Sequence, residues 1–569
     1  MVIQSGVLTG SPVVAYFSME IGVDPAIPTY SGGLGVLAGD TLRGAADLGV
    51  PMVGVTLLHR KGYVRQGLDS QGSQLESPHD WSPEGVLQPV EPHVAVNIEG
   101  RQVRVRAWRY LIEGVLGYTV PVYLLDTDLP ENSASDRAFT DHLYGGDDRY
   151  RLCQEVILGM GGVAMLRALG HTGILTYHMN EGHSALLSLA LLAERTGGLG
   201  PGAVASSDIE AVRQQCVFTT HTPVPAGHDN FSFDLVERVM GGVLGSALRQ
   251  SACCPMGTLN MTYLALYFSR YINGVAMRHG EISRGMYPDY PINSITNGVH
   301  AATWTAPAFQ RLYDRLIPEW RRDNHYLRYA IGIPLNEIRQ AHAEAKREML
   351  AEVHQRTGMS LDLAVMTIGF ARRATMYKRA DLLLSDTERL KRIVSQVGPL
   401  QIVYGGKAHP RDDGGKAMIR RVFEVAAALR DTLSIVYVPD YDMFLGRHLC
   451  AGADLWLNTP LKPQEASGTS GMKAALNGVP SLSVLDGWWI EGHIEGLTGW
   501  SIGDSSQTPS SSAAEAASLY DKLEYLIVPT FYKRPDDYAE TMRSSIAMNG
   551  SFFNTHRMVH QYVKNAYRL

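Results

Sequence analysis

The 569-residue sequence predicts an α/β protein built from two doubly wound parallel sheets that face a common cleft. Three observations favour this fold class. Short apolar runs alternate with amphipathic stretches along the chain, which is the pattern of parallel strands and the helices that cover them. Loops rich in glycine and polar residues follow the apolar runs, where open parallel sheets bind their ligands. The charged helical stretch Leu335–Val353 separates two sets of these units.

The first set of units lies before residue 335. Its predicted strands are Val13–Tyr16, Pro51–Leu58, Ile174–Tyr177, Val217–Thr219 and Asn293–Thr296. The loops expected after strands of this set are Thr29–Asp40, His178–His183, His221–Asn230 and Asn297–His300. A helix is expected at Thr41–Leu48, directly after the first of these loops.

The second set repeats the scheme. Its predicted strands are Leu363–Ile368, Gln401–Val403, Ser434–Val438 and Ala453–Asn458, and their loops are Gly369–Lys378, Gly405–Gly415, Pro439–Asp442 and Pro460–Lys473. Ser512 and Glu515 have the spacing of a capping box and predict the start of a later helix. We therefore expect one domain at residues 1–334, a second at 335–530, and C-terminal helices at 531–569 that pack back on the first domain.

The composition excludes several classes of protein. Lys and Arg total 51 against 57 Asp and Glu, so the net charge is −6, which disfavours a general binder of nucleic acid or anionic membranes. The five cysteines form no CxxC pair and are too few for a disulfide framework. The first basic residue is Arg43, and no apolar run approaches the ~18 residues of a membrane span. A cytoplasmic protein is expected.

The glycine-rich segment Ser31–Gly39 follows the first predicted strand. Gly33, Gly35 and Ala38 match the dinucleotide fingerprint in spacing. That fingerprint needs an acidic residue at the end of the second strand, and Val53–His59 offers none. Backbone N–H groups that face an anion or a sugar hydroxyl are therefore favoured over NAD binding. A tight turn without a ligand stays an alternative.

A cationic cluster follows the strand at Leu363–Ile368. Arg372, Arg373, Lys378 and Arg379 lie where the strand ends and a helix is expected to begin. Arginine offers a planar fork and lysine a point charge, and both suit phosphate oxygens. The position at the end of a strand favours phosphate capture, and a solvated helix face is the alternative.

Lys473 ends a run of small and hydroxylated residues that begins at Glu465 and leads into a helix. The N-terminus of a helix disfavours a cation, so this lysine is expected to have another use. Near Arg373 its ammonium would be destabilised, which would lower its pKa toward that of a nucleophilic amine able to form a Schiff base.

Four histidines lie in the expected loops: His178, His183, His221 and His228. No HExxH helix or three-ligand spacing accompanies them, so no metal is expected. His221 is equally consistent with a substrate contact and with a structural hydrogen bond. Trp488 and Trp489 could stack on sugar rings, but a place in the core is favoured.

Taken together, these segments resemble the α-glucan (glycogen, starch or maltodextrin) phosphorylases, a pyridoxal-phosphate family with two Rossmann-like domains in the glycosyltransferase-B fold. The resemblance runs from about Val14 to Tyr567. Its densest matches are SGGLGVLAGD, YHMNEGHSA, FTTHTPVPAGHD, ITNGVH, GFARRATMYKRADLL, GGKAHP and EASGTSGMKAALNG. The last motif is the most specific, because it carries the lysine that holds the cofactor in this family, here Lys473.

The resemblance implies a retaining α-1,4-glucan phosphorylase that transfers terminal glucosyl units from glucan to orthophosphate and yields α-D-glucose 1-phosphate. Its catalytic residues would be Lys473, Arg373, Lys378 and His221. Pyridoxal 5'-phosphate would be held by Lys473, Thr469, Ser470, Arg372, Tyr441 and Trp304. Arg373 and Lys378 would bind the substrate phosphate, and the glucosyl unit would be surrounded by Gly33, Leu34, His221, Asn297, Glu465, Ser467 and Gly468. The resemblance also implies a homodimer and no metal.

Three features depart from the long members of the family and concern regulation and glucan binding. The chain begins almost at the first strand, without the N-terminal regulatory extension of long members, and Gly22 stands where those members have a tyrosine. The segment LDGWWIEG also differs from theirs. A nucleotide-sugar glucosyltransferase of the same fold and a non-catalytic glucan-binding protein remain the alternatives.

Overall fold

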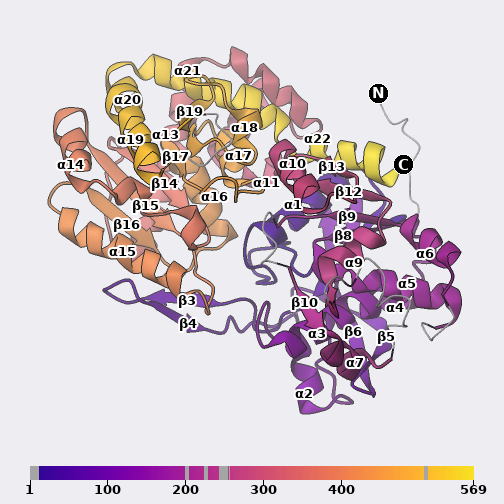
Figure 1. Ribbon diagram of the computed structural model, residues 1–569. Coiled ribbons are helices and arrows are strands. Elements are labelled where there is room, and N and C mark those ends of the chain that lie inside the picture. The colour runs from indigo at the N-terminus through magenta and orange to yellow at the C-terminus, as the bar shows by residue number, and fades with distance from the viewer. Residues whose placement is uncertain (1–11, 199–203, 223–227, 243–253, 255–256, 505–510) are drawn as a thin grey trace.

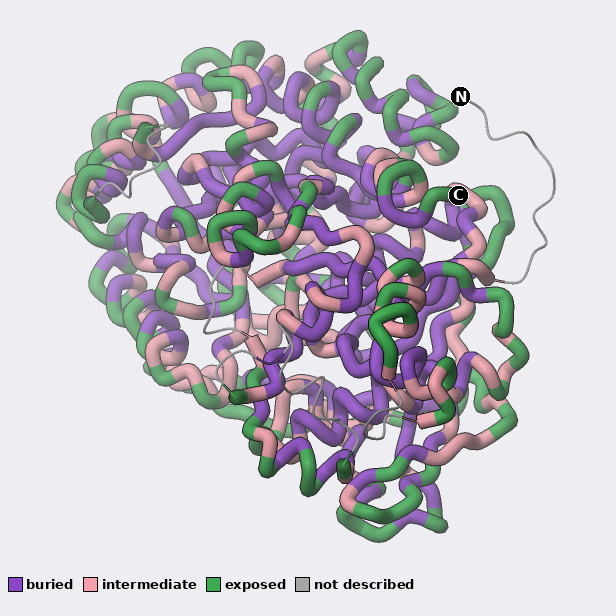
Figure 2. Tube along the Cα trace, turned by 45° about the vertical axis from the view of Figure 1, so that its right-hand side comes forward, coloured by how far each residue is buried: buried purple, intermediate pink, exposed green. Residues whose placement is uncertain are grey.

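The computed structural model describes residues 12–198, 204–222, 228–242, 254, 257–504 and 511–569. The chain forms two large sheets, each flanked by helices (Figure 1). One sheet collects strands from before residue 300 and the other collects strands from after residue 365. Buried residues run through the interior around both sheets, and exposed residues are concentrated on the outside (Figure 2).

The first sheet has the strand order β13-β12-β9-β8-β1-β2-β7-β6-β5. Its strands are β1 (Val14–Phe17), β2 (Met52–Leu57), β5 (Gln88–Ile98), β6 (Arg101–Glu113), β7 (Thr119–Asp126), β8 (Thr176–Asn180), β9 (Cys216–Thr219), β12 (Tyr271–Gly274) and β13 (Ile292–Ser294). The prediction of a parallel sheet is wrong at one edge, where β6 runs antiparallel to both β5 and β7. The short links between these strands leave no room for the crossover that parallel pairing needs.

Helices in this half of the chain are α1 (Gly33–Asp47), α2 (Ala134–Arg137), α3 (Asp148–Val156), α4 (Gly162–Ala168), α5 (Leu186–Thr196), α6 (Ser206–Arg213), α7 (Phe233–Met240), α9 (Met261–Tyr267), α10 (Met277–Met286), α11 (Ala301–Trp304) and α12 (Pro307–Leu316). Two hairpins complete it: β3 (Arg65–Leu68) with β4 (Gln74–Ser77), and β10 (Asn230–Ser232) with β11 (Thr258–Asn260). The β3–β4 hairpin reaches the other sheet, since Gln66 donates to the carbonyl of Gly406 over 3.1 Å (Figure 1).

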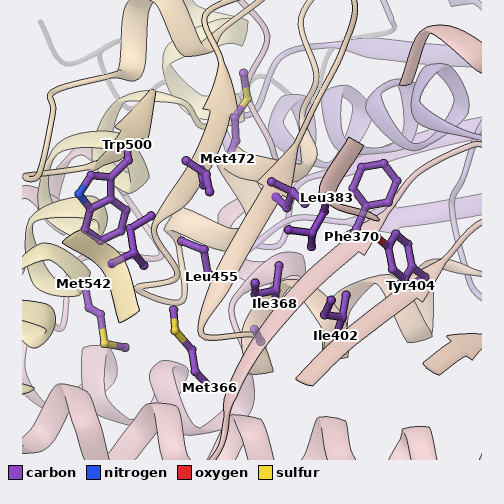
Figure 3. Close-up of a cluster of buried hydrophobic side chains, with 14 of the residues drawn as sticks. Met366, Ile368, Phe370, Leu383, Ile402, Tyr404, Leu455, Met472, Trp500 and Met542 are labelled. Carbon is purple, nitrogen blue, oxygen red and sulfur yellow. The ribbon is translucent and has the colours of Figure 1, made fainter. Parts of the chain in front are cut away.

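The second sheet is entirely parallel, as the sequence predicts, in the order β16-β15-β14-β17-β18-β19. Its strands are β14 (Met366–Ala371), β15 (Leu400–Gly405), β16 (Ser434–Val438), β17 (Leu455–Asn458), β18 (Ser481–Val484) and β19 (Gly499–Ile502). Its helices are α13 (Leu335–Thr357), α14 (Thr387–Gln396), α15 (Asp413–Leu429), α16 (Met443–Gly452), α17 (Ser470–Ala475), α18 (Trp489–Gly492), α19 (Ser512–Lys522) and α20 (Val528–Lys533). Figure 3 shows its apolar core, in which Ile368, Ile402 and Leu455 of three strands lie together with Met472 of α17.

The C-terminal helices α21 (Pro535–Ser545) and α22 (Thr555–Gln561) pass from the second sheet to the first (Figure 1). His556 of α22 and His300 both bond one oxygen of Asp47 in α1, at 3.1 and 2.8 Å. The hydroxyl of Tyr567 lies 2.7 Å from Nδ1 of His178 in β8. Helix α1, the segment at His300 and the C-terminal helices are thus held together beside the first sheet.

Three predicted elements were wrong in detail. The glycine-rich segment is not a loop, because α1 begins at Gly33 rather than at Thr41. A Cβ on Gly39 would lie 2.0 Å from the carbonyl oxygen of Gly22, so this glycine lets the helix approach the loop after β1. The cationic segment was expected to begin a helix, but only the short 3₁₀ helix Met376–Lys378 forms there. The N-cap of α19 is Ser511 rather than the predicted Ser512. The serine-rich loop at 505–510 and the centre of the loop after His221 lie outside the described residues.

In the part of the chain that the structure describes, no helix is long and apolar enough to cross a membrane. No group of three potential metal ligands is found there. Trp488 and Trp489 are 2% and 0% exposed, which confirms the core interpretation of this pair.

Replacing Gly298 with alanine is expected to destabilise the protein. Its new Cβ would lie 2.1 Å from the carbonyl oxygen of Asn554, where the C-terminal segment crosses the first sheet. Overpacking of this kind costs about 1–3 kcal/mol. Gly285→Ala in α10 is the control, because that Cβ meets nothing within 4 Å. Urea unfolding should show a lower midpoint for G298A alone, and equal midpoints would contradict the expected collision.

Candidate active site

Strand β14 ends in the cationic segment, where Arg372 and Lys378 share one carboxylate. Arg372 Nη2 lies 2.5 Å from Oε2 of Glu465, and Lys378 Nζ lies 2.7 Å from the same oxygen. All three side chains are largely buried. Burial alone would raise the pKa of Glu465, but Arg372 and Lys378 outweigh it and lower that pKa to about 2. Two cations therefore share one buried anion.

Arg373 has no such partner. Within the described residues it makes no ion pair, and its side chain is exposed although protein groups surround it closely. The pKa of Arg373 is raised on balance. Burial alone would lower that pKa, but four nearby groups outweigh it: Tyr377, Tyr63, Tyr144 and Glu20. Tyr63, Tyr144 and Glu20 belong to the half of the chain that forms the first sheet. Arg373 thus lies close to residues of that half of the chain.

Lys473 lies in α17 and is 6% exposed. Its Nζ has no hydrogen bond or ion pair to any described residue, and it lies 3.6 Å from the centre of the Trp304 ring. The Trp304 indole in turn donates to Asp40 over 2.7 Å. The pKa of Lys473 is lowered, as predicted, but burial and Arg43 lower it while Asp40 and Cys450 raise it. The predicted cause, the Arg373 cluster, was wrong.

Cys450 and Tyr441 connect Lys473 with Arg372 through electrostatic interactions. Burial raises the pKa of Cys450 to about 12, and Lys473 opposes the shift. Burial raises the pKa of Tyr441 too, with Cys450 adding to it and Arg372 opposing. The backbone carbonyl of Ser470 accepts from the Cys450 thiol at 3.7 Å, and its hydroxyl accepts from Trp456. Four of the predicted cofactor residues are therefore linked through one buried region.

The first sheet contributes residues from the ends of β8, β9 and β13. His221 Nε2 lies 2.6 Å from Oδ1 of Asn180, and its backbone N–H donates to Glu181 over 2.8 Å. Burial lowers the pKa of His221 to about 4, so the ring is neutral at pH 7. Asn297 is fixed by its backbone, which donates to the carbonyl of Val275 over 3.0 Å. No hydrogen bond or ion pair among described residues joins His221 to Arg373 or Lys473.

Gly33 and Leu34 form the first turn of α1, which faces open space. A Cβ on Gly33 would meet nothing within 4 Å. Glu20 holds the start of this helix, because its carboxylate accepts from the backbone N–H groups of Ser31 and Gly32 and from Tyr144. Burial raises the pKa of Glu20.

Sequence reasoning missed Glu20, Asp40 and Asp486. Glu20 follows β1 and could have been noticed as an acidic residue at the carboxyl end of a strand. Asp40 falls inside the quoted glycine motif, but nothing in the sequence shows that it meets Trp304. Asp486 accepts from the backbone N–H of Glu465 over 3.0 Å and fixes that residue. Burial raises the pKa of Asp486 to about 6.

Three of the predicted residues carry buried polar atoms without a hydrogen-bond partner. They are Nη1 of Arg372, Oγ of Ser467 and Oδ1 of Asn297. Gly468 next to Ser467 has a φ of +81°, so its backbone takes a conformation that favours glycine. Buried polar groups are almost always paired in native proteins. These atoms are therefore suited to a ligand rich in hydrogen-bonding groups.

Glu465→Gln is expected to change the acid stability of the protein. A carboxyl whose pKa falls from 4.5 to about 2 on folding stabilises the folded state above pH 4.5, and this contribution is lost as the pH falls toward 2. The urea midpoint of E465Q should lie below that of the parent at neutral pH, and the difference should shrink below pH 4.5. A difference that does not depend on pH would contradict the charged pairing.

Comparison with known proteins identifies the family of the chain. Residues 248–496 match the family model described as carbohydrate phosphorylase. A maltodextrin phosphorylase of Thermococcus litoralis is 39% identical over 97% of this chain and 70% of its own length. Glycogen phosphorylases of Mycobacterium tuberculosis and Aquifex aeolicus are 37% and 34% identical over 97% of this chain, and over 70% and 86% of their own lengths. The chain belongs to the carbohydrate phosphorylase family.

Proposed function

We propose that the protein is a retaining α-1,4-glucan phosphorylase, which transfers a terminal glucosyl unit from a glucan to orthophosphate and yields α-D-glucose 1-phosphate. Family membership and the names of the relatives support the reaction class. The observation that carries the proposal is the concentration of positive charge at one edge of the second sheet. Arg372, Arg373 and Lys378 follow β14. The amine of Lys473 has no ion pair to any described residue and is connected to Arg372 through Cys450 and Tyr441.

The proposed fold is the glycosyltransferase-B arrangement of two doubly wound domains around a cleft. We propose domains at residues 1–334 and 335–530, with helices at 531–569 returning to the first. The two sheets, with no strand shared between them, support this division. Arg373 lies close to Tyr63, Tyr144 and Glu20 from the half of the chain with the first sheet, and this proximity supports the cleft. A homodimer and a cytoplasmic location stay predictions.

Pyridoxal 5'-phosphate fits the residues around Lys473. A buried amine with a lowered pKa and no ion pair is suited to a carbonyl cofactor, which bonds covalently to an uncharged amine. Trp304 would lie against the cofactor, and Thr469, Ser470, Tyr441 and the unpartnered Nη1 of Arg372 would hold its phosphate. When bound, the cofactor supplies a phosphate group that exchanges a proton with the substrate phosphate.

Arg373 and Lys378 would bind the orthophosphate. Two phosphates close together repel each other strongly unless cations lie around them. Arg373 is exposed and has no ion pair within the described residues, so it is available to an anion without breaking an ion pair. Lys378 is held by Glu465, so an incoming phosphate would compete with that carboxylate. Displaced from Lys378, Glu465 would be free to bond a sugar hydroxyl.

The glucosyl unit would lie between the two sheets. Gly33 and Leu34 would offer backbone groups, and Asn297, Ser467 and Gly468 would bond its hydroxyls. His221 would act as a neutral hydrogen-bonding group beside the sugar, because burial holds its pKa near 4.

The cations have a second effect on the chemistry. Orthophosphate protonates the glycosidic oxygen as the glucan leaves, and the same phosphate then attacks the positively charged sugar centre from the same face. Arg373 and Lys378 would hold the phosphate in place through both events. The carboxylate pair of ordinary glycosidases is therefore not required.

The direct test is the release of glucose 1-phosphate from maltodextrin by protein supplied with pyridoxal phosphate. Release is expected to need orthophosphate and to give the α anomer. Release of free glucose without phosphate, or glucosyl transfer from a nucleotide sugar in its place, would contradict the proposal.

Arg373→Ala is expected to raise the KM for phosphate roughly ten- to a hundredfold. It removes a charge-assisted contact worth ~1.5–3 kcal/mol. Retention of the cofactor, measured by absorbance, should not change, because Arg373 is not among its proposed ligands. Arg420→Ala on the exposed face of α15 is the matched control. An unchanged phosphate KM in R373A would show that this guanidinium does not meet the substrate.

A further inference from the structure

An arginine of the C-terminal helices binds the backbone of the loop Thr296–Val299, which carries the proposed sugar ligand Asn297. Arg557 in α22 donates through Nη1 to the carbonyl oxygen of Thr296 over 2.5 Å and through Nη2 to that of Asn297 over 2.8 Å. The loop follows β13, and α22 lies beside the end of that strand (Figure 1). One guanidinium thus binds two consecutive carbonyls where the chain leaves the first sheet.

The remaining acceptors of Arg557 are uncharged oxygens too. Its Nε donates to the carbonyl of Phe552 over 3.0 Å, and Nη1 donates to the side chain of Gln561 over 3.0 Å. Burial lowers the pKa of Arg557 to about 10, with Glu491 and Tyr562 opposing the shift, so the side chain is charged at pH 7. Hydrogen bonds that involve a charged group are stronger than neutral ones. The charge therefore strengthens each bond to the loop.

The residues on both sides of Asn297 are held by later parts of the chain. The hydroxyl of Thr296 donates to Oε2 of Glu491 in α18 over 2.7 Å. The backbone N–H of Val299 donates to the carbonyl of Phe553 over 3.1 Å. Contacts from two other elements therefore leave the backbone of this loop little freedom to shift.

The side chain of Asn297 differs from this backbone, because its oxygen has no partner. Oδ1 is buried without a hydrogen bond, and the residue is 3% exposed. An unpaired buried acceptor is costly, so a ligand group that donates to Oδ1 is the expected partner. A firmly held backbone around such a side chain fixes a binding group before its ligand arrives.

We infer that Arg557 is a positioning residue, which holds Asn297 in the orientation that bonds a hydroxyl of the glucosyl unit. The inference rests on the proposed function, in which Asn297 contacts that unit. Arg557 itself would not touch the substrate, because protein oxygens already accept from all three of its nitrogens. The C-terminal helices would then serve the sugar site as well as the fold.

A double-mutant cycle tests this role. Arg557→Gln should lower kcat/KM for maltodextrin about three- to tenfold, which is the range of one neutral hydrogen bond. Asn297→Ala should cause a loss of similar size. Because Arg557 acts through Asn297, adding R557Q to N297A should cost less than about twofold more. Losses that multiply in the double variant, or an unchanged kcat/KM in folded R557Q, would overturn the inference.

Two further variants separate positioning from stability. Arg557→Lys keeps the charge and can bond one of the two carbonyls, so it should recover part of the lost kcat/KM. Should R557Q not fold, the cycle is built on R557K. Arg543→Gln in α21 is the matched control, because Arg543 also donates to a backbone carbonyl, that of Ile333, over 3.0 Å. R543Q should lower the urea midpoint and leave kcat/KM unchanged. A loss of kcat/KM in R543Q equal to that in R557Q would overturn the inference.

Binding of glucose 1-phosphate repeats the cycle without turnover. It is measured by ligand-observed NMR on the protein supplied with pyridoxal phosphate. A parent that does not phosphorolyse maltodextrin would contradict the proposed function, yet a non-additive cycle in binding would still support the role of Arg557. Absence of binding by the parent, or additive losses of affinity in R557Q and N297A, would overturn the inference even if the parent is active.

Discussion

The proposed active site depends on an excess of positive charge in a largely buried region. Arg372 and Lys378 share the single carboxylate of Glu465, and the amine of Lys473 lies against the Trp304 ring with no ion pair to any described residue. Each unpaired buried charge costs several kcal/mol. A protein keeps such an arrangement when a bound anion or a covalent partner completes it. The proposed phosphates and carbonyl cofactor would do so, and this requirement links the electrostatics of the site to its chemistry.

The fold makes this arrangement possible by placing the cations at the carboxyl ends of strands. Side chains that follow β14 and β17 meet at one edge of the second sheet because both strands run in the same direction. The first sheet offers His221 and Asn297 from its own strand ends. The Asp47 contacts with His300 and His556 tie α1 to the C-terminal helices, and Trp304 meets Lys473 nearby.

Much of the fold could be predicted from alternation of apolar and polar runs. The strand at Ser434–Val438 was predicted to the residue, and the other eight predicted strands lie within a few positions of observed ones. Several strands were not predicted at all, among them β12, β18 and β19. The start of α1 could not be predicted, because glycines that usually mark a loop here serve the close approach of a helix to Gly22. The antiparallel edge was missed because no strand was predicted at β5, β6 or β7.

The site was predicted unevenly for similar reasons. Residues in dense motifs, such as Lys473 and Arg372, could be named from the sequence. Contacts between distant segments could not, so the roles of Asp40 beneath Trp304 and of Asp486 behind Glu465 appear only in three dimensions. The pKa of Lys473 was predicted in the right direction, yet burial, which a sequence does not display, is its main cause.

Reductive trapping tests the central claim most directly. The protein is incubated with pyridoxal phosphate, reduced with borohydride and digested, and the modified peptide is identified by mass spectrometry. A buried amine that lacks an ion pair and has a lowered pKa should react first, so the label is expected on Lys473 at one equivalent per chain. Label spread over exposed lysines, with Lys473 unmodified, would contradict it.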